Sequence, residues 1–132
     1  ILDLSYCWIK LIGQYSFHKL NRLIDLRLNN NMIKSLNGSL INLTNLESID
    51  LSNNLIQSIL STDFIQYKRA SFSLNYLKLN NNPLKQLDGI NRILIHLNMA
   101  NLNNLNSYFI ESIQFESLLN LEELDMSFNN IS

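Results

Sequence analysis

The side chains that could act as nucleophiles or general bases are few and widely separated in this chain. It contains one cysteine, Cys7, and two histidines, His18 and His96. Nucleophilic catalysis needs a Ser or Cys beside a His that a carboxylate orients, and no segment suggests such a group. Metal sites need clustered Cys, His, Asp or Glu, and the sequence has no cluster with metal-ligand spacing. Phosphate-binding loops need several glycines close together, and the whole chain has only three glycines. We therefore expect no enzyme, no bound metal and no cofactor.

Asparagine recurs at one fixed place in an apolar pattern. Segment 46–59 reads L-x-x-I-x-L-x-x-N-x-I-x-x-I, with Asn54 as its one fixed polar position. The Asn amide has two donors and an acceptor, so it can bond backbone groups left unpaired where a strand ends and the chain turns. We expect the residues at this position of successive repeats to form a buried polar ladder. Cys7 takes the place of Asn in the first repeat, where its thiol can donate weakly to a carbonyl. The ladder residues are Cys7, Asn31, Asn54, Asn82 and Asn129.

The apolar positions of the same pattern predict a coil of short strands. Ile49 and Leu51 are two residues apart, so on a strand both point inward while Asp50 points outward. One such turn cannot bury its own apolar face, whereas stacked turns bury it jointly. We therefore expect an α/β solenoid: a coil with one short parallel β-strand per repeat on the concave face, and irregular or short helical outer arcs.

Six strand motifs recur along residues 1–132, which we interpret as one domain. Their first strand residues are Leu2, Leu26, Ile49, Leu77, Leu97 and Leu124, at spacings of 24, 23, 28, 20 and 27 residues. In the fifth motif Leu102 falls in the ladder slot, which predicts a kink or bulge near residues 101–104.

The outer arcs differ in length. Residues 61–73 predict a short helix that Ser61 or Thr62 caps, with Asp63 in its first turn and Lys68 and Arg69 near its end. Residues 107–115 have apolar side chains at helical spacing and predict another. The short arc after Leu87 predicts extended chain or a turn at residues 88–89.

These tandem motifs resemble the leucine-rich-repeat superfamily over essentially the whole chain. Residues 7–23 are similar to the "typical" subclass of roughly 24 residues, N-x-I-x-x-I-x-x-x-x-F-x-x-L-x-x-L, with Cys in place of the first Asn. That subclass includes Toll-like receptors, chaoptin-like adhesion proteins and small proteoglycans. The resemblance implies a right-handed coil, a protein ligand or co-receptor as partner, and an extracellular or cell-surface location, with a cytoplasmic location as the alternative.

Composition excludes several classes of partner. The net charge is −1 and the pI about 6.1, so nothing favours nucleic acid. No apolar run has the 18 or so residues of a membrane span, so we expect no direct membrane insertion.

The chain begins inside a strand motif and has no capping repeats, although solenoids need them. We therefore expect an internal fragment of a longer ectodomain.

Three sequons are possible N-glycosylation sites, at Asn37, Asn42 and Asn130. With 22 Asn and 17 Ser or Thr among 132 residues, chance alone gives about three sequons. They therefore carry no weight for localisation.

The side chains that alternate with the strand leucines line the predicted concave face. The central column reads Asp3, Arg27, Asp50, Lys78, Asn98 and Asp125, and the preceding column includes Tyr76, His96 and Glu123. One interpretation is a ladder of ion pairs with Arg27 between Asp3 and Asp50. The other is a protein-binding site. Its residues are Arg27, Asp50, Tyr76, Lys78 and His96.

Three functions remain open for such a domain. The first is a receptor or adhesion ectodomain that binds protein on its concave face. The second is an intracellular scaffold or regulatory subunit, and the third is an extracellular matrix protein. The signal peptide, cysteine caps and membrane span of the full-length protein would distinguish them.

Overall fold

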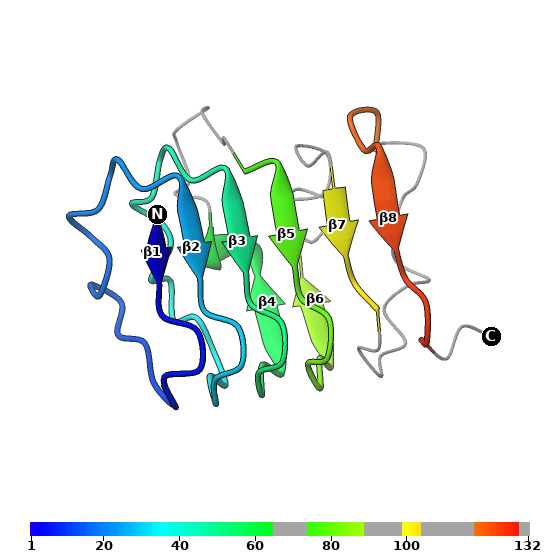
Figure 1. The fold of residues 1–132 in the computed structure, drawn as a ribbon, viewed down its shortest axis with the longest axis horizontal. Coiled ribbons are helices and arrows are strands. Elements are labelled where there is room, and N and C mark those ends of the chain that lie inside the picture. Colours follow the sequence, from blue (N-terminus) through cyan, green and yellow to red (C-terminus); the bar gives the residue numbers. More distant parts are fainter. Residues whose placement is uncertain (65–73, 89–98, 104–117, 130–132) are drawn as a thin grey trace.

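The computed structural model describes residues 1–64, 74–88, 99–103 and 118–129. Within these residues, six short strands form one parallel sheet (Figure 1). They are β1 (Leu2–Asp3), β2 (Asp25–Arg27), β3 (Ser48–Asp50), β5 (Tyr76–Lys78), β7 (Met99–Asn101) and β8 (Glu123–Asp125). They lie side by side in chain order. One parallel strand per repeat in an open sheet fits the predicted solenoid.

The apolar positions flanking each central strand residue form the core. Leu26 and Leu28 flank Arg27, Ile49 and Leu51 flank Asp50, and all four apolar side chains are completely buried. Strand alternation turns them inward, and the turn on either side covers them. The layers at the edges of the sheet are less enclosed. Leu2, Leu4, Leu124 and Met126 are only partly buried where they pack on the core.

The fifth strand corrects the predicted register. Leu77 pairs with Ala100, and Ala100 pairs with Leu124. Ala100 therefore takes the place predicted for Leu97, and the flanking spacings become 23 and 24 residues. Leu102, completely buried, follows as the second inward residue and does not occupy the ladder slot. The irregularity that predicted a kink or bulge arose from the wrong alignment.

The outer side contains a second, two-stranded parallel sheet that the repeat pattern does not predict. It consists of β4 (Ser58–Leu60) and β6 (Gln86–Asp88), behind the main sheet in Figure 1. Ile59 pairs with Leu87. The chain is extended from Gln86 to Asp88, whereas the arc predicted to be extended after Leu87 continues beyond the described residues. The turn predicted at residues 88–89 extends beyond the described residues.

The predicted helix after β4 begins as one turn of 3-10 helix, η1 (Ser61–Asp63). Its predicted continuation through Lys68 and Arg69, and the arc 107–115, lie outside the described residues. Asp63 is more than the first-turn acid that was expected. Its Oδ1 accepts a hydrogen bond from Gly38 N and its Oδ2 one from Leu60 N, both at 2.9 Å. This buried carboxylate therefore joins the outer arcs of the second and third repeats.

A left-handed residue precedes each described ladder position. Asn30, Asn53 and Asn81 have φ of 57°, 54° and 59°. Asn tolerates this region better than most side chains because its short polar group bonds locally. The equivalent residues of the first and last turns are Tyr6 and Phe128, at 56° and 59°. Both aromatic side chains are exposed, so packing does not explain their strained backbone.

Candidate protein-binding surface

The asparagine ladder fixes the exits of the concave strands. Asn54 Oδ1 accepts a hydrogen bond from Ile33 N at 3.0 Å, and its Nδ2 donates to Leu28 O at 2.9 Å and Leu51 O at 3.1 Å. The side chain is buried. One amide thus bonds the backbone of its own turn and of the preceding one, as its place in the pattern predicts.

The other ladder asparagines make equivalent bonds. Asn31 Nδ2 donates to Leu4 O and Leu28 O, both at 2.9 Å. Asn82 Nδ2 donates to Leu51 O at 2.9 Å and Leu79 O at 2.8 Å. Asn129 Nδ2 donates to Leu102 O and Met126 O, both at 2.8 Å. Asn31 and Asn82 are buried, and Asn129 is half-buried.

Cys7 occupies the ladder slot of the first turn but is exposed, which contradicts the predicted burial. Its Sγ lies 3.2 Å from Ser5 O, and its backbone N donates to Asn31 Oδ1 at 3.1 Å. The thiol therefore makes the weak bond that was expected. It is exposed because its turn follows β1, the edge strand, so no described turn covers it.

The outward side chains of β1, β2, β3 and β5 line an open depression of about 450 Å³. Polar groups dominate it. Its lining residues are Asp3, Ser5, Asp25, Arg27, Asn29, Ser48, Asp50, Tyr76 and Lys78. Register pairing sets Asp3, Arg27, Asp50 and Lys78 side by side, so charges of opposite sign alternate across the sheet.

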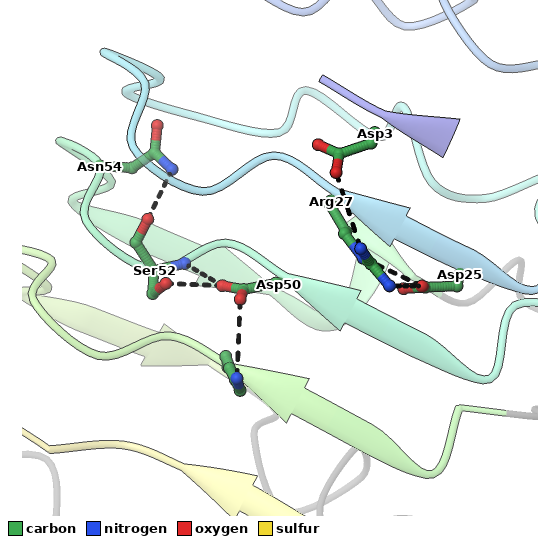
Figure 2. A network of polar contacts seen from close by, with 7 residues as sticks. Asp3, Asp25, Arg27, Asp50, Ser52 and Asn54 are labelled. Carbon is green, nitrogen blue, oxygen red and sulfur yellow. Dashed lines mark hydrogen bonds and ion pairs between the residues drawn. The ribbon is translucent and has the colours of Figure 1, made fainter. Parts of the chain in front are cut away.

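The charges in the depression are paired. The predicted pair of Arg27 with Asp3 is present, whereas Asp50 pairs with Lys78 and not with Arg27 as predicted. Arg27 lies between two acids of the first and second strands (Figure 2). Its Nη2 is 2.9 Å from Asp25 Oδ2, and its Nη1 is 3.6 Å from Asp3 Oδ2. Asp50 instead faces Lys78 Nζ at 3.8 Å. The contact with Asp25 was missed because the predicted pairing considered only one column of side chains.

Tyr76 and Lys78 lie on the same face of β5. Lys78 Nζ is 5.4 Å from the centre of the Tyr76 ring, within range of a cation–π contact. Tyr76 is half-buried. The Lys78 side chain is 35% accessible and that of Asp50 21%. Part of the Tyr76 side chain and the two charged groups therefore remain accessible.

Three acids of the central column accept hydrogen bonds from a serine two residues later. Ser52 N and Oγ donate to Asp50 Oδ1 at 3.0 and 2.6 Å (Figure 2). The Ser5 hydroxyl and backbone N–H, with Arg27 nearby, hold the pKa of Asp3 below its ordinary value of 3.8. The backbone N–H and hydroxyl of Ser127, then the Asn103 amide, lower the pKa of Asp125. The serine hydrogen bonds hold these three carboxylates in place.

The new register removes His96 and Asn98 from the predicted columns. Met99 lies between Tyr76 and Glu123, and Asn101 lies between Lys78 and Asp125. His96 lies outside the described residues.

The possible glycosylation sites differ in their surroundings. Asn37 Nδ2 donates to Ile12 O at 3.0 Å, and Ser39 of its sequon is buried. Asn42 is exposed. Asn130 lies outside the described residues. Asn37 is exposed as well, although its amide bonds Ile12 O.

A family model described as leucine rich repeat matches residues 1–65. This part of the chain is similar to leucine-rich repeats. The parallel sheet continues past the matched part through β5, β7 and β8, with the same strand register. Leucine-rich repeats generally mediate protein–protein interactions and typically lack catalytic activity. A comparison with curated proteins found no match.

No helix within residues 1–64, 74–88, 99–103 and 118–129 has the length and apolar character needed to cross a membrane. No three His, Cys, Asp or Glu side chains in them are grouped closely enough to hold a metal ion.

Proposed function

We propose that the concave face of this leucine-rich-repeat domain binds a protein ligand or co-receptor through Asp50, Tyr76 and Lys78, with Arg27 at the border of the contact. The observation that carries the proposal is the open depression over β1, β2, β3 and β5. Its floor combines a half-buried aromatic ring with fixed charges of both signs. Aromatic anchors flanked by polar groups suit protein interfaces.

An extracellular or cell-surface ectodomain is the setting we propose. The support is the similarity of residues 7–23 to the "typical" leucine-rich-repeat subclass. The same similarity implies a right-handed coil, in keeping with the strong right-handed preference of parallel crossovers. An intracellular scaffold and a matrix protein are the alternatives. A signal peptide with a membrane span favours the first setting, no signal peptide favours the scaffold, and a signal peptide without a span favours the matrix protein.

The binding experiment uses photo-crosslinking to capture the partner. A benzophenone amino acid replaces Tyr76 on the concave face or, as a control, exposed Tyr15 on an outer arc. The captured protein is then purified, and its affinity is measured for the wild type, Y76A and Y15A. We expect Tyr76→Ala to weaken binding by about 2 kcal/mol, as truncation of an interface anchor does, and Tyr15→Ala to leave it unchanged.

The rival site is the long outer arc, through Tyr67, Lys68 and Arg69, which lies outside the described residues. Loss of binding in a triple alanine variant of that arc, with full binding by Y76A, overturns the concave site. Loss in Y76A alone supports it.

A further inference from the structure

The surface immediately after the ladder has a composition unlike that of the concave face. Four equivalent segments, residues 7–12, 31–36, 54–59 and 82–87, contain three lysines and no Asp or Glu. In Figure 1 these segments follow the turns below strands β1, β2, β3 and β5. We name this surface the lysine flank.

Alternation along each segment gives the lysine flank two outward columns. The middle residues, Ile33, Ile56 and Leu84, are completely buried, so the residues on either side of them point outward. The first column is apolar: Trp8, Met32, Leu55 and Pro83. The second column is polar: Lys10, Lys34, Gln57 and Lys85, all exposed.

Backbone hydrogen bonds hold neighbouring members of the second column together. Gln57 N donates to Lys34 O at 3.3 Å, and Lys85 N donates to Gln57 O at 2.8 Å. Turns bonded in this way are about 4.8 Å apart. The cations of Lys34 and Lys85 are thus carried on backbones separated by about 10 Å, with a neutral residue between them.

The cations of the lysine flank are not neutralised within the described part of the chain. No ion pair there involves Lys10, Lys34 or Lys85. Arg27 and Lys78 on the concave face, in contrast, are each paired with a carboxylate. The flank therefore keeps an unbalanced positive charge in a chain whose net charge is −1.

The apolar column bears an observation that points to binding. Trp8 is 74% exposed and has φ of 57°. A bulky side chain in the left-handed region is strained, and such strain concentrates at sites of function. The equivalent position of the third turn is Leu55, which is also exposed. Neither its own packing nor its backbone explains a tryptophan at position 8.

We propose that the lysine flank docks an extended polypeptide segment in which acidic and apolar residues alternate. A chain lying between the two columns would direct alternate side chains to opposite sides. Its carboxylates would meet Lys10, Lys34 and Lys85, and its apolar side chains would cover Trp8 and Leu55. An anionic membrane fits less well, because surfaces that recognise such lipids use clusters of about four to eight basic residues.

The test uses the whole 132-residue chain and a fluorescent peptide of alternating Glu and Leu, about twelve residues long so that it reaches about 40 Å when extended. Anisotropy measures binding at low salt. We expect Lys34→Glu with Lys85→Glu to weaken binding about tenfold. The matched control, Lys19→Glu with Arg22→Glu, makes the same change in charge at exposed outer-arc residues. It should weaken binding less than about twofold.

Trp8→Asn tests the apolar column without disturbing the backbone, because Asn accepts the left-handed region. We expect its melting temperature to equal or exceed that of the wild type while peptide binding falls about fivefold. Leu119→Asn, at an apolar residue before β8 that is even more exposed than Trp8, is the control and should leave binding unchanged.

Three results would overturn the proposal. Equal losses in the two charge-reversal pairs would show a general effect of charge. The second is a wild type that binds vesicles of phosphatidylcholine with phosphatidylserine and not the peptide. If the Lys34 and Lys85 variant then lost the vesicle binding, the lysine flank would be a membrane-binding surface. If the wild type bound neither the peptide nor the vesicles, the lysine flank would not be a docking site. Tyr76→Ala should leave peptide binding intact, so this test is separate from that of the concave site.

Discussion

Each ladder asparagine satisfies backbone groups of two turns at once. Asn54→Ala removes the acceptor of Ile33 N and the donor of Leu28 O and Leu51 O. Each buried group left unpaired costs about 1–3 kcal/mol. We expect Asn54→Ala to lower the free energy of unfolding by at least about 3 kcal/mol, measured by urea denaturation.

The control for Asn54→Ala is a substitution at the neighbouring Asn53, and it must be compatible with the left-handed backbone of that residue. Asn53 has φ of 54°, so Ala there would be strained by about 1–2 kcal/mol. We therefore compare Asn54→Ala with Asn53→Gly, which we expect to change the stability by less than about 0.5 kcal/mol. Equal urea midpoints for the two variants would contradict the assignment of the ladder.

The serines beside the acids of the concave face affect how those acids titrate. Ser5→Ala removes the hydroxyl donor that contributes most to lowering the pKa of Asp3. We expect that pKa to rise toward 3.8, as followed by NMR titration of the carboxyl carbon. Ser127→Ala should raise the pKa of Asp125 less, since the backbone N–H of residue 127 is the larger cause there and remains.

The sign of the accompanying pH dependence follows from the lowered pKa. A carboxylate with a lowered folded pKa stabilises the fold above its ordinary pKa, and this contribution is lost as the pH falls through the folded value. The stability of wild type should therefore fall somewhat more steeply than that of Ser5→Ala between about pH 5 and pH 2. Parallel pH profiles would show that the Ser5 hydroxyl has no such effect.

Among the elements, the outer arcs of the second and third repeats depend on Asp63. Asp63→Ala leaves Gly38 N and Leu60 N without their acceptor in a buried region. We expect a loss of about 2–4 kcal/mol in the free energy of unfolding, measured in urea. Asp63→Asn keeps one acceptor oxygen and should lose roughly half as much. A loss from Asn as large as that from Ala would assign the effect to the charge.

The strand elements differ in enclosure across the whole molecule. The inward apolar side chains of β2, β3 and β5 are completely buried, whereas the inward apolar side chains of β1 and β8 are partly exposed. Solenoids open from their least covered turns. In hydrogen exchange of the isolated chain, we expect the amides of β1 and β8 to exchange before those of β3 and β5. Uniform protection in a monomeric sample would mean that the edge layers are as stable as the centre.

Charge is also separated across the whole molecule. The concave face pairs its cations with acids at 2.9 to 3.8 Å, whereas the lysine flank has lysines without acids in the same segments. Salt should therefore weaken binding at the flank more than at the concave face, because unpaired surface charges attract a partner through solvent and are screened.

Local spacing was sufficient to predict much of this fold. Asn31, Asn54 and Asn82 could be assigned because each stands at a fixed distance from two inward leucines, and side-chain alternation depends only on the strand itself. The same reasoning placed Arg27, Asp50, Tyr76 and Lys78 on one face. The coil, the parallel strands and four of the five later anchors needed nothing beyond this periodicity.

Contacts between turns decided the rest. Around residue 100 the spacing allowed two alignments, because Leu97, Met99, Ala100 and Leu102 are all apolar, and only pairing with β5 and β8 chose Ala100. The burial of Cys7 depended on whether another turn covers it. The partners of Asp63 are 3 and 25 residues away in the chain, and the larger separation has no local signal. The sequence of each turn determines which of its side chains point inward. The stacking of turns determines which side chains and backbone groups contact one another.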